Sequence, residues 1–182
     1  MDSGIKVDKT IPLTGLIGTM KEACDAKKNM LFFDESGSLS TFFSYKATLF
    51  ELNKEILAKL IGKKTLEEVK EKFRKMIIGT MKRGDNLAIF VDMQIPDFKN
   101  EFFDPEYVHP DIFDQEVMDK KENYKSMLRK EDDVDDYGLS GGFYKRDDWM
   151  ISIVTRASVE EEGANAKKFL PLDKFYVVRV TN

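Results

Sequence analysis

The sequence predicts a single α/β domain in which a mostly parallel sheet is flanked by helices. A helix signal over residues 65–83 leads within a few residues into the apolar run 87–91, as in an αβ unit. That run is continuously apolar, which is typical of a strand covered on both faces in a parallel sheet. The length of 182 residues fits one domain, which can bury roughly 70% of the surface that its unfolded chain exposes.

The N-terminal segment, residues 1–27, is expected to be a polar tail in front of the domain at 28–182. Leu13, Leu16 and Met20 recur at helical spacing, which predicts a loop followed by a short helix. A segment that docks on a partner protein has the same pattern. We therefore expect a docking tail here.

Two aromatic segments follow. Residues 30–33 form a compact apolar run that ends in the turn residues 34–37, which predicts a buried strand. Residues 42–50 contain four aromatic side chains and predict a second strand or a mixture of strand and helix.

The helix over 65–83 has the clearest boundaries. Thr65 and Glu68 form a capping box, in which the hydroxyl accepts from the backbone of Glu68 and the Glu68 carboxylate reaches back. Gly84 can adopt the left-handed conformation that closes a helix. The strand at 87–92 then ends in Asp92.

Residues 94–120 contain three of the five prolines and many acidic residues, which predicts a loop-rich insert with one short helix near 111–118. A short helix is expected at 122–130, followed by the acidic cluster 131–136 and a glycine turn at 138–142.

The C-terminal part predicts two further strands. They lie at 149–156 and 175–180, and a polar loop is expected between them at 157–168.

Composition excludes several classes of protein. Charged residues make up 34% of the chain, but the net charge is only −4 and no basic stripe is present, so neither nucleic acid nor a membrane surface is an expected partner. Cys24 is the only cysteine, which suits a reducing compartment. No apolar run approaches the roughly 20 residues of a membrane span, and the N-terminus lacks a signal-peptide pattern. We expect a cytoplasmic or cytoskeletal protein.

The sequence lacks the glycine-rich string that holds nucleotide phosphates. Residues 15–19 contain two glycines without the required lysine, and residues 34–38 contain carboxylates that repel phosphate. Asp92 ends an apolar strand, as in a magnesium-binding strand, but Met93 stands where the second acid belongs. A turn or cap at Asp92 is the more common role of such a residue.

No other catalytic or metal site is indicated. His109 is the only histidine, so a multi-histidine metal site is excluded, and nothing in the sequence supports its pairing with Cys24. Ser140 lies in a glycine turn rather than in a nucleophile elbow. The acids at 131–136 lack the spacing of a calcium loop and are expected to form a solvated surface. We therefore predict no catalytic, cofactor-binding or metal-binding residue.

Several segments, in this order, resemble the fifth AAA+ module of dynein heavy chains and the C-terminal module of ciliary ankyrin-repeat and IQ-motif proteins. The resemblance covers residues 28–181 and is carried by the segments 29–37, 70–92, 104–105, 124–129, 147–156 and 175–181. It implies a P-loop NTPase-like fold without its phosphate loop. The chain departs from the dynein pattern at Glu35, where dynein has proline, so neither motor activity nor a catalytic residue is transferred.

The resemblance implies a cellular setting. Dynein-like modules and their ciliary relatives are placed on axonemal microtubules, which leads us to expect a non-catalytic structural protein of the ciliary axoneme. Its expected partners are axonemal proteins, with tubulin as a further candidate, and its expected docking segments are 1–27 and 94–120. One alternative is a nucleotide-binding regulator or small enzyme of P-loop ancestry, and another is a cytosolic adaptor with no ciliary role.

Overall fold

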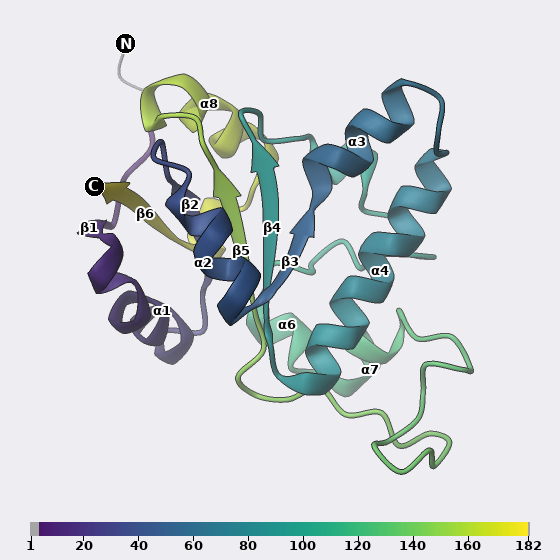
Figure 1. The fold of residues 1–182 in the computed structure, drawn as a ribbon. Coiled ribbons are helices and arrows are strands. Elements are labelled where there is room, and N and C mark those ends of the chain that lie inside the picture. The colour runs from purple at the N-terminus through teal and green to yellow at the C-terminus, as the bar shows by residue number, and fades with distance from the viewer. Residues whose placement is uncertain (1–3, 182) are drawn as a thin grey trace.

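A six-stranded sheet, parallel throughout, forms the centre of the molecule (Figure 1). The computed structural model describes residues 4–181. The strands are β1 (Lys9–Pro12), β2 (Asn29–Phe33), β3 (Thr48–Glu51), β4 (Asn86–Asp92), β5 (Met150–Thr155) and β6 (Phe175–Thr181). Their order across the sheet is β1-β6-β2-β5-β4-β3. The predicted α/β class with a parallel sheet is confirmed, and the architecture is consistent with a P-loop NTPase-like fold.

Helices cover both faces of the sheet. They are α1 (Leu16–Asp25), α2 (Ser38–Lys46), α3 (Leu52–Leu60), α4 (Leu66–Arg83), α5 (Phe98–Glu101), α6 (Gln115–Met118), α7 (Lys121–Lys125) and α8 (Val159–Phe169). Two 3₁₀ turns, η1 (Leu13–Gly15) and η2 (Leu172–Lys174), precede α1 and β6.

Alternate residues along β2, β3, β4, β5 and β6 supply two separate cores. On one face, Phe32 of β2 packs with Leu16 of α1 and Phe43 of α2. On the other face, Leu31 of β2 belongs to the larger core that includes α4, α8 and the segment between β4 and β5. Because neighbouring side chains of a strand point to opposite faces, a fully buried strand such as β2 serves both cores.

The helix predicted over 65–83 is confirmed as α4. Thr65 and Glu68 form both hydrogen bonds of the capping box, and Gly84 closes the helix with φ of 74°. A side chain at Gly84 would also meet the Asp148 carboxylate, so both the backbone and the space favour glycine. The 42–50 segment is the predicted mixture, since it contains the end of α2 and most of β3.

Several predictions differ from the structure. The insert 94–120 contains two short helices, α5 and α6, instead of one, and the helix expected at 122–130 ends at Lys125. The expected polar loop at 157–168 is largely the helix α8, whose own capping box joins Ser158 and Glu161. The expected tail at 1–27 contains β1 and α1, which pack into the domain: Ile11 and Leu16 are buried, and β1 pairs with β6. The tail therefore does not form a separate segment over residues 4–27.

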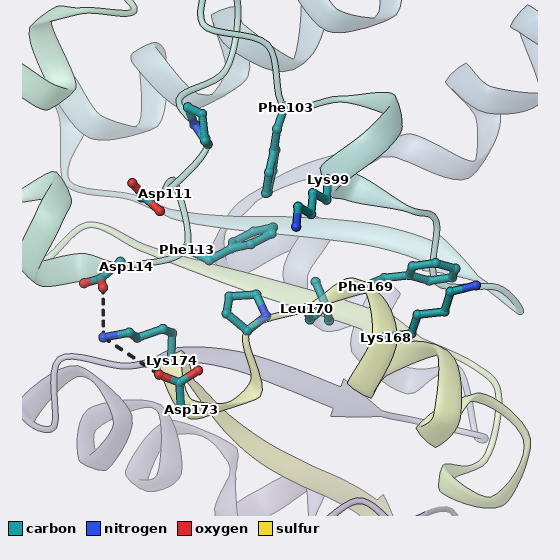
Figure 2. A pocket seen from close by; sticks show the side chains of 12 residues that line it. Lys99, Phe103, Asp111, Phe113, Asp114, Lys168, Phe169, Leu170, Asp173 and Lys174 are labelled. Carbon is teal, nitrogen blue, oxygen red and sulfur yellow. Dashed lines mark ion pairs between the residues drawn. The ribbon is translucent and has the colours of Figure 1, made fainter.

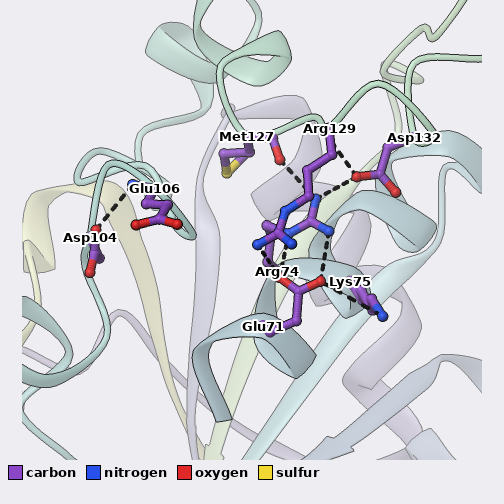
Figure 3. Close-up of polar contacts among 8 residues, drawn as sticks. All are labelled: Glu71, Arg74, Lys75, Asp104, Glu106, Met127, Arg129 and Asp132. Carbon is purple, nitrogen blue, oxygen red and sulfur yellow. Dashed lines mark hydrogen bonds and ion pairs between the residues drawn. The ribbon is translucent and has the colours of Figure 1, made fainter. Parts of the chain in front are cut away.

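A buried arginine attaches the long β4–β5 connection to α4 (Figure 3). The Arg74 side chain is 1% exposed and donates to both carboxylate oxygens of Glu71, at 2.8 and 2.9 Å. It also donates to the Met127 carbonyl at 2.9 Å and to Asp132 at 2.5 Å. These bonds satisfy the guanidinium within the fold and hold residues 127–132 against the helix.

Candidate functional site

The carboxyl edge of the sheet contains the position where open parallel sheets bind ligands. The connection that leaves β2 enters α2 on one face, whereas the connection that leaves the adjacent β5 enters α8 on the other face. Such a change of direction leaves a crevice at the carboxyl ends of the two strands. Asp34 follows β2, Arg156 follows β5, and Asp92 ends β4, so these three residues meet at this edge.

The Asp34 carboxylate accepts hydrogen bonds from within the loop that joins β2 to α2. The residue is fully buried, and the backbone amide of Leu39 in the first turn of α2 donates to its Oδ2 at 2.7 Å. The Ser36 hydroxyl donates to Oδ1 at 2.5 Å. The amides at a helix N-terminus are the groups that hold phosphates in nucleotide-binding loops. Here one of them is hydrogen-bonded to an anion of the chain itself.

Arg156 lies across the same loop. Gly37 has a φ of 73°, and a Cβ atom built there would lie 3.2 Å from the Arg156 Nε. The Arg156 side chain therefore packs directly against this turn. Arg156 was not among the residues singled out from the sequence. The one sequence feature that could have indicated its role is a positively charged residue directly after a buried strand.

Asp92 has an unusual conformation for a non-glycine residue. Its φ is 60°, and a register shift interrupts the β4–β5 ladder between Phe90 and Asp92. The Asp92 carbonyl accepts from the Thr155 hydroxyl and from the Arg156 amide, both at 2.7 Å. The Asp92 carboxylate lies 3.9 Å from Arg156 and forms no hydrogen bond, and its Oδ1 is buried.

The residues of this crevice do not fit a nucleotide phosphate. The buried Asp34 carboxylate repels a phosphate and uses the Leu39 amide. Asp92 has no second acid beside it, and no group of three histidine, cysteine or acidic residues within 4–181 could hold a metal ion.

The structure separates the remaining candidates. Cys24 packs beside the α1–α2 core, whereas the segment around His109 packs into the core on the opposite face of the sheet. The His109 Nδ1 accepts from the Asp111 amide at 3.0 Å. A Cys24–His109 dyad is therefore not formed.

The acidic cluster is more structural than the expected solvated surface. Asp132 binds Arg74, and Asp133 accepts from Lys125 at 2.9 Å. The hydrogen bond from Lys125 holds the pKa of the Asp133 carboxyl below its usual range. Ser140 lies in the predicted glycine turn, which includes Gly141 at φ of 79°.

The predicted insert lines a cavity of about 600 Å³ against the end of α8 (Figure 2). Phe103 and Phe113 come from the insert, and Phe169 comes from the end of α8. Figure 2 shows Lys99 extending toward the rings of Phe103 and Phe113. Lys99 forms no ion pair with any residue that the structure describes, whereas Lys174 at the far end binds Asp114 at 2.8 Å.

Comparisons with family models, with curated proteins and with solved structures gave no match to this chain. The resemblance to dynein modules therefore stays a proposal. No helix within residues 4–181 has the length and apolar character to cross a bilayer.

Proposed function

We propose that this protein is a non-catalytic structural protein of the ciliary axoneme, where it binds doublet microtubules or the proteins attached to them. The observation that carries the non-catalytic part is the buried Asp34 carboxylate at the start of α2. A P-loop ancestor would bind phosphate at this place, and an internal anion makes such binding unfavourable.

The ciliary setting is supported by the ordered resemblance of residues 28–181 to a dynein ring module and to modules of ciliary proteins. The strand–helix–strand order implied by that resemblance agrees with the parallel sheet. The net charge of −4 favours an axonemal protein over acidic tubulin as the direct neighbour.

The insert at 94–120 supplies the surface that we assign to docking. Long ordered connections with little regular structure are usually functional. This one presents the aromatic cavity of Phe103, Phe113 and Phe169 together with Lys99, which forms no ion pair among residues 4–181. A protein segment with an apolar side chain next to an acidic one fits that combination.

Localisation of a tagged copy in a ciliated cell, followed by salt extraction of isolated axonemes, tests the proposal. We expect the protein to remain on the axoneme through high salt, as a built-in component does. A diffuse cytoplasmic signal contradicts the ciliary role.

Calorimetric titration with ATP, ADP and GTP tests the alternative, a nucleotide-binding regulator. We expect no heat of binding for the three nucleotides. Saturable binding that is lost in Arg156→Ala would favour the alternative instead.

A further inference from the structure

The most exposed aromatic side chain within residues 4–181 lies at the tip of the loop between α7 and β5. Tyr137 is 97% exposed, and its hydroxyl forms no hydrogen bond with any of these residues. A bridge between Val134 and Ser140 closes the base of the tip. Figure 1 shows this loop, drawn in green beyond α7, extending away from the helices and the sheet. An enzyme can therefore approach the phenol from most directions.

Tyr137 lies in a turn and not in a helix or strand. The Asp135 Oδ1 holds this turn by accepting from the Tyr137 amide at 2.8 Å and from the Leu139 amide at 2.7 Å. Gly138 follows with φ of 84° and open space around it. A kinase must draw the substrate chain into its active site so that the hydroxyl reaches the transferred phosphoryl group. Here only a few solvent-exposed hydrogen bonds have to open for that to happen.

The other five tyrosines are engaged by the fold. Tyr124 is buried, and the ring of Tyr107 packs against two cationic side chains. The hydroxyls of Tyr144 and Tyr176 donate to carboxylates, at 3.2 and 3.4 Å. Tyr45 is 83% exposed, but it belongs to α2, whose backbone hydrogen bonds hold it in helical form. The structure therefore offers one tyrosine that is both exposed and outside regular structure.

The residues before Tyr137 carry negative charge. Five of the six positions 131–136 are acidic, and two of these acids are bound to internal cations. Asp135 forms no ion pair with any residue that the structure describes, and Asp136 pairs at 3.1 Å with Arg146 while both side chains stay more than half exposed. The phenol thus follows two solvent-accessible carboxylates. A substrate groove rich in lysine and arginine is complementary to them.

We propose that Tyr137 is a phosphorylation site for a tyrosine kinase whose substrate groove is basic. In that reaction the phenol oxygen bonds to the γ-phosphorus of ATP, and the bond between the γ-phosphorus and the oxygen of ADP breaks. The phenol proton passes to the catalytic carboxylate of the kinase, and ADP leaves. The phosphate adds a charge of about −1.5 to −2 next to Asp135 and Asp136. The modified turn then presents the kind of anion that arginine clusters bind.

The test incubates the full chain with ATP, Mg²⁺ and the purified catalytic domain of a tyrosine kinase that prefers acidic residues before its tyrosine. Mass spectrometry of proteolytic peptides follows the phosphate on each tyrosine with time. Tyr137 and Tyr144 share the tryptic peptide 131–145, so fragmentation spectra assign the phosphate to one of them. We expect Tyr137 to carry most of the phosphate.

Tyr137→Phe changes only an exposed side chain, so the fold is retained, and we expect most of the incorporation to be lost. Tyr45→Phe, at the other highly exposed tyrosine, is the matched control and is expected to change nothing. A double variant, Asp135→Asn with Asp136→Asn, removes both charges and keeps an acceptor oxygen for the turn. We expect its initial rate to fall about fivefold, which is the worth of two exposed ion pairs.

Phosphate mainly on Tyr45 or Tyr144, no incorporation above a kinase-free blank, or an unchanged rate in the double variant would each overturn the inference. A synthetic peptide of residues 129–143 reports whether the kinase accepts this sequence. Phosphorylation of the peptide without that of the full chain would show that the folded loop withholds the tyrosine, which also overturns it. Neither axonemes nor nucleotide binding by this chain enters these outcomes, so a failure here leaves the ciliary proposal standing.

Discussion

Single residues decide what the carboxyl edge of the sheet can bind. The sequence predicts that residues 34–38 are too acidic for a phosphate loop, and this prediction needs only the residue types. It does not show that Asp34 is fully buried or that its carboxylate accepts from Leu39, because those facts depend on where α2 begins. Arg156 was missed for the same reason: its importance comes from Asp92 and Gly37, which are distant in the sequence.

Asp34→Ala is expected to lower the free energy of unfolding by about 1–3 kcal/mol, because the buried Leu39 amide loses its acceptor. Asp34→Asn keeps an acceptor oxygen at that place and should cost less. Urea unfolding followed by circular dichroism measures both changes. Glu35→Ala, on an exposed neighbour, should stay within about 0.5 kcal/mol of the wild type. A loss as large as that of Asp34→Ala in the control would contradict this role.

Arg74→Met is expected to cost about 3 kcal/mol, because it leaves the carboxylates of Glu71 and Asp132 without their buried partner. The hydrogen bond from Arg74 holds the pKa of Glu71 below its ordinary value. Glu71 thus stabilises the fold above the ordinary glutamate pKa of about 4.3, and this contribution is lost as the pH falls through the lower folded value. The difference between wild type and variant should therefore shrink from pH 7 to about pH 3. A difference that does not change with pH would rule out the ionic explanation.

At the scale of single elements, strong periodicity made the prediction easy and its absence made it fail. The α4 helix repeats apolar residues at helical spacing and has a capping box, so its limits were predicted to within one residue. The α8 helix has the same capping signature at Ser158 and Glu161. Its buried face, however, includes Gly163 and Ala166, which give little hydrophobic signal. The small residues let the helix pack closely on the sheet. They also leave the sequence without the apolar periodicity that predicts a helix, so a loop was predicted.

Ser158→Ala is expected to destabilise the protein by about 1 kcal/mol, because the amide of Glu161 loses its acceptor at the start of α8. Thermal unfolding compared with Ser44→Ala, an exposed serine of α2, provides the measurement. Equal effects of the two substitutions would show that the α8 cap has no particular role.

At the scale of the whole molecule, the sequence predicted one α/β domain but placed its beginning too late. The four residues of β1 are too few for an alternating pattern, and Pro12 weakens a strand assignment. Only the pairing with β6, between residues 169 positions apart such as Lys9 and Val178, makes them part of the sheet. Pairings of this separation cannot be read from local sequence.

Ile11→Ala is expected to cost about 2–4 kcal/mol if residues 9–25 belong to the domain, because Ile11 is buried between the sheet and α1. Ile17→Ala, at an exposed position of α1, is the matched control and should cost less than about 0.5 kcal/mol. Chemical denaturation of the two variants compares them directly. Similar small effects would instead support a loosely attached tail.

The placement of β6 between β1 and β2 has a consequence for how the chain reaches its native state. β1 has no other strand to pair with, so it cannot join the sheet until β6 has inserted. Closing such distant contacts is slow compared with forming helices. During synthesis, the edge of β2 that pairs with β6 therefore stays uncovered until residues 175–181 have left the ribosome. The newly made chain is most open to mispairing with another copy during this interval, and the insertion of a single strand ends it.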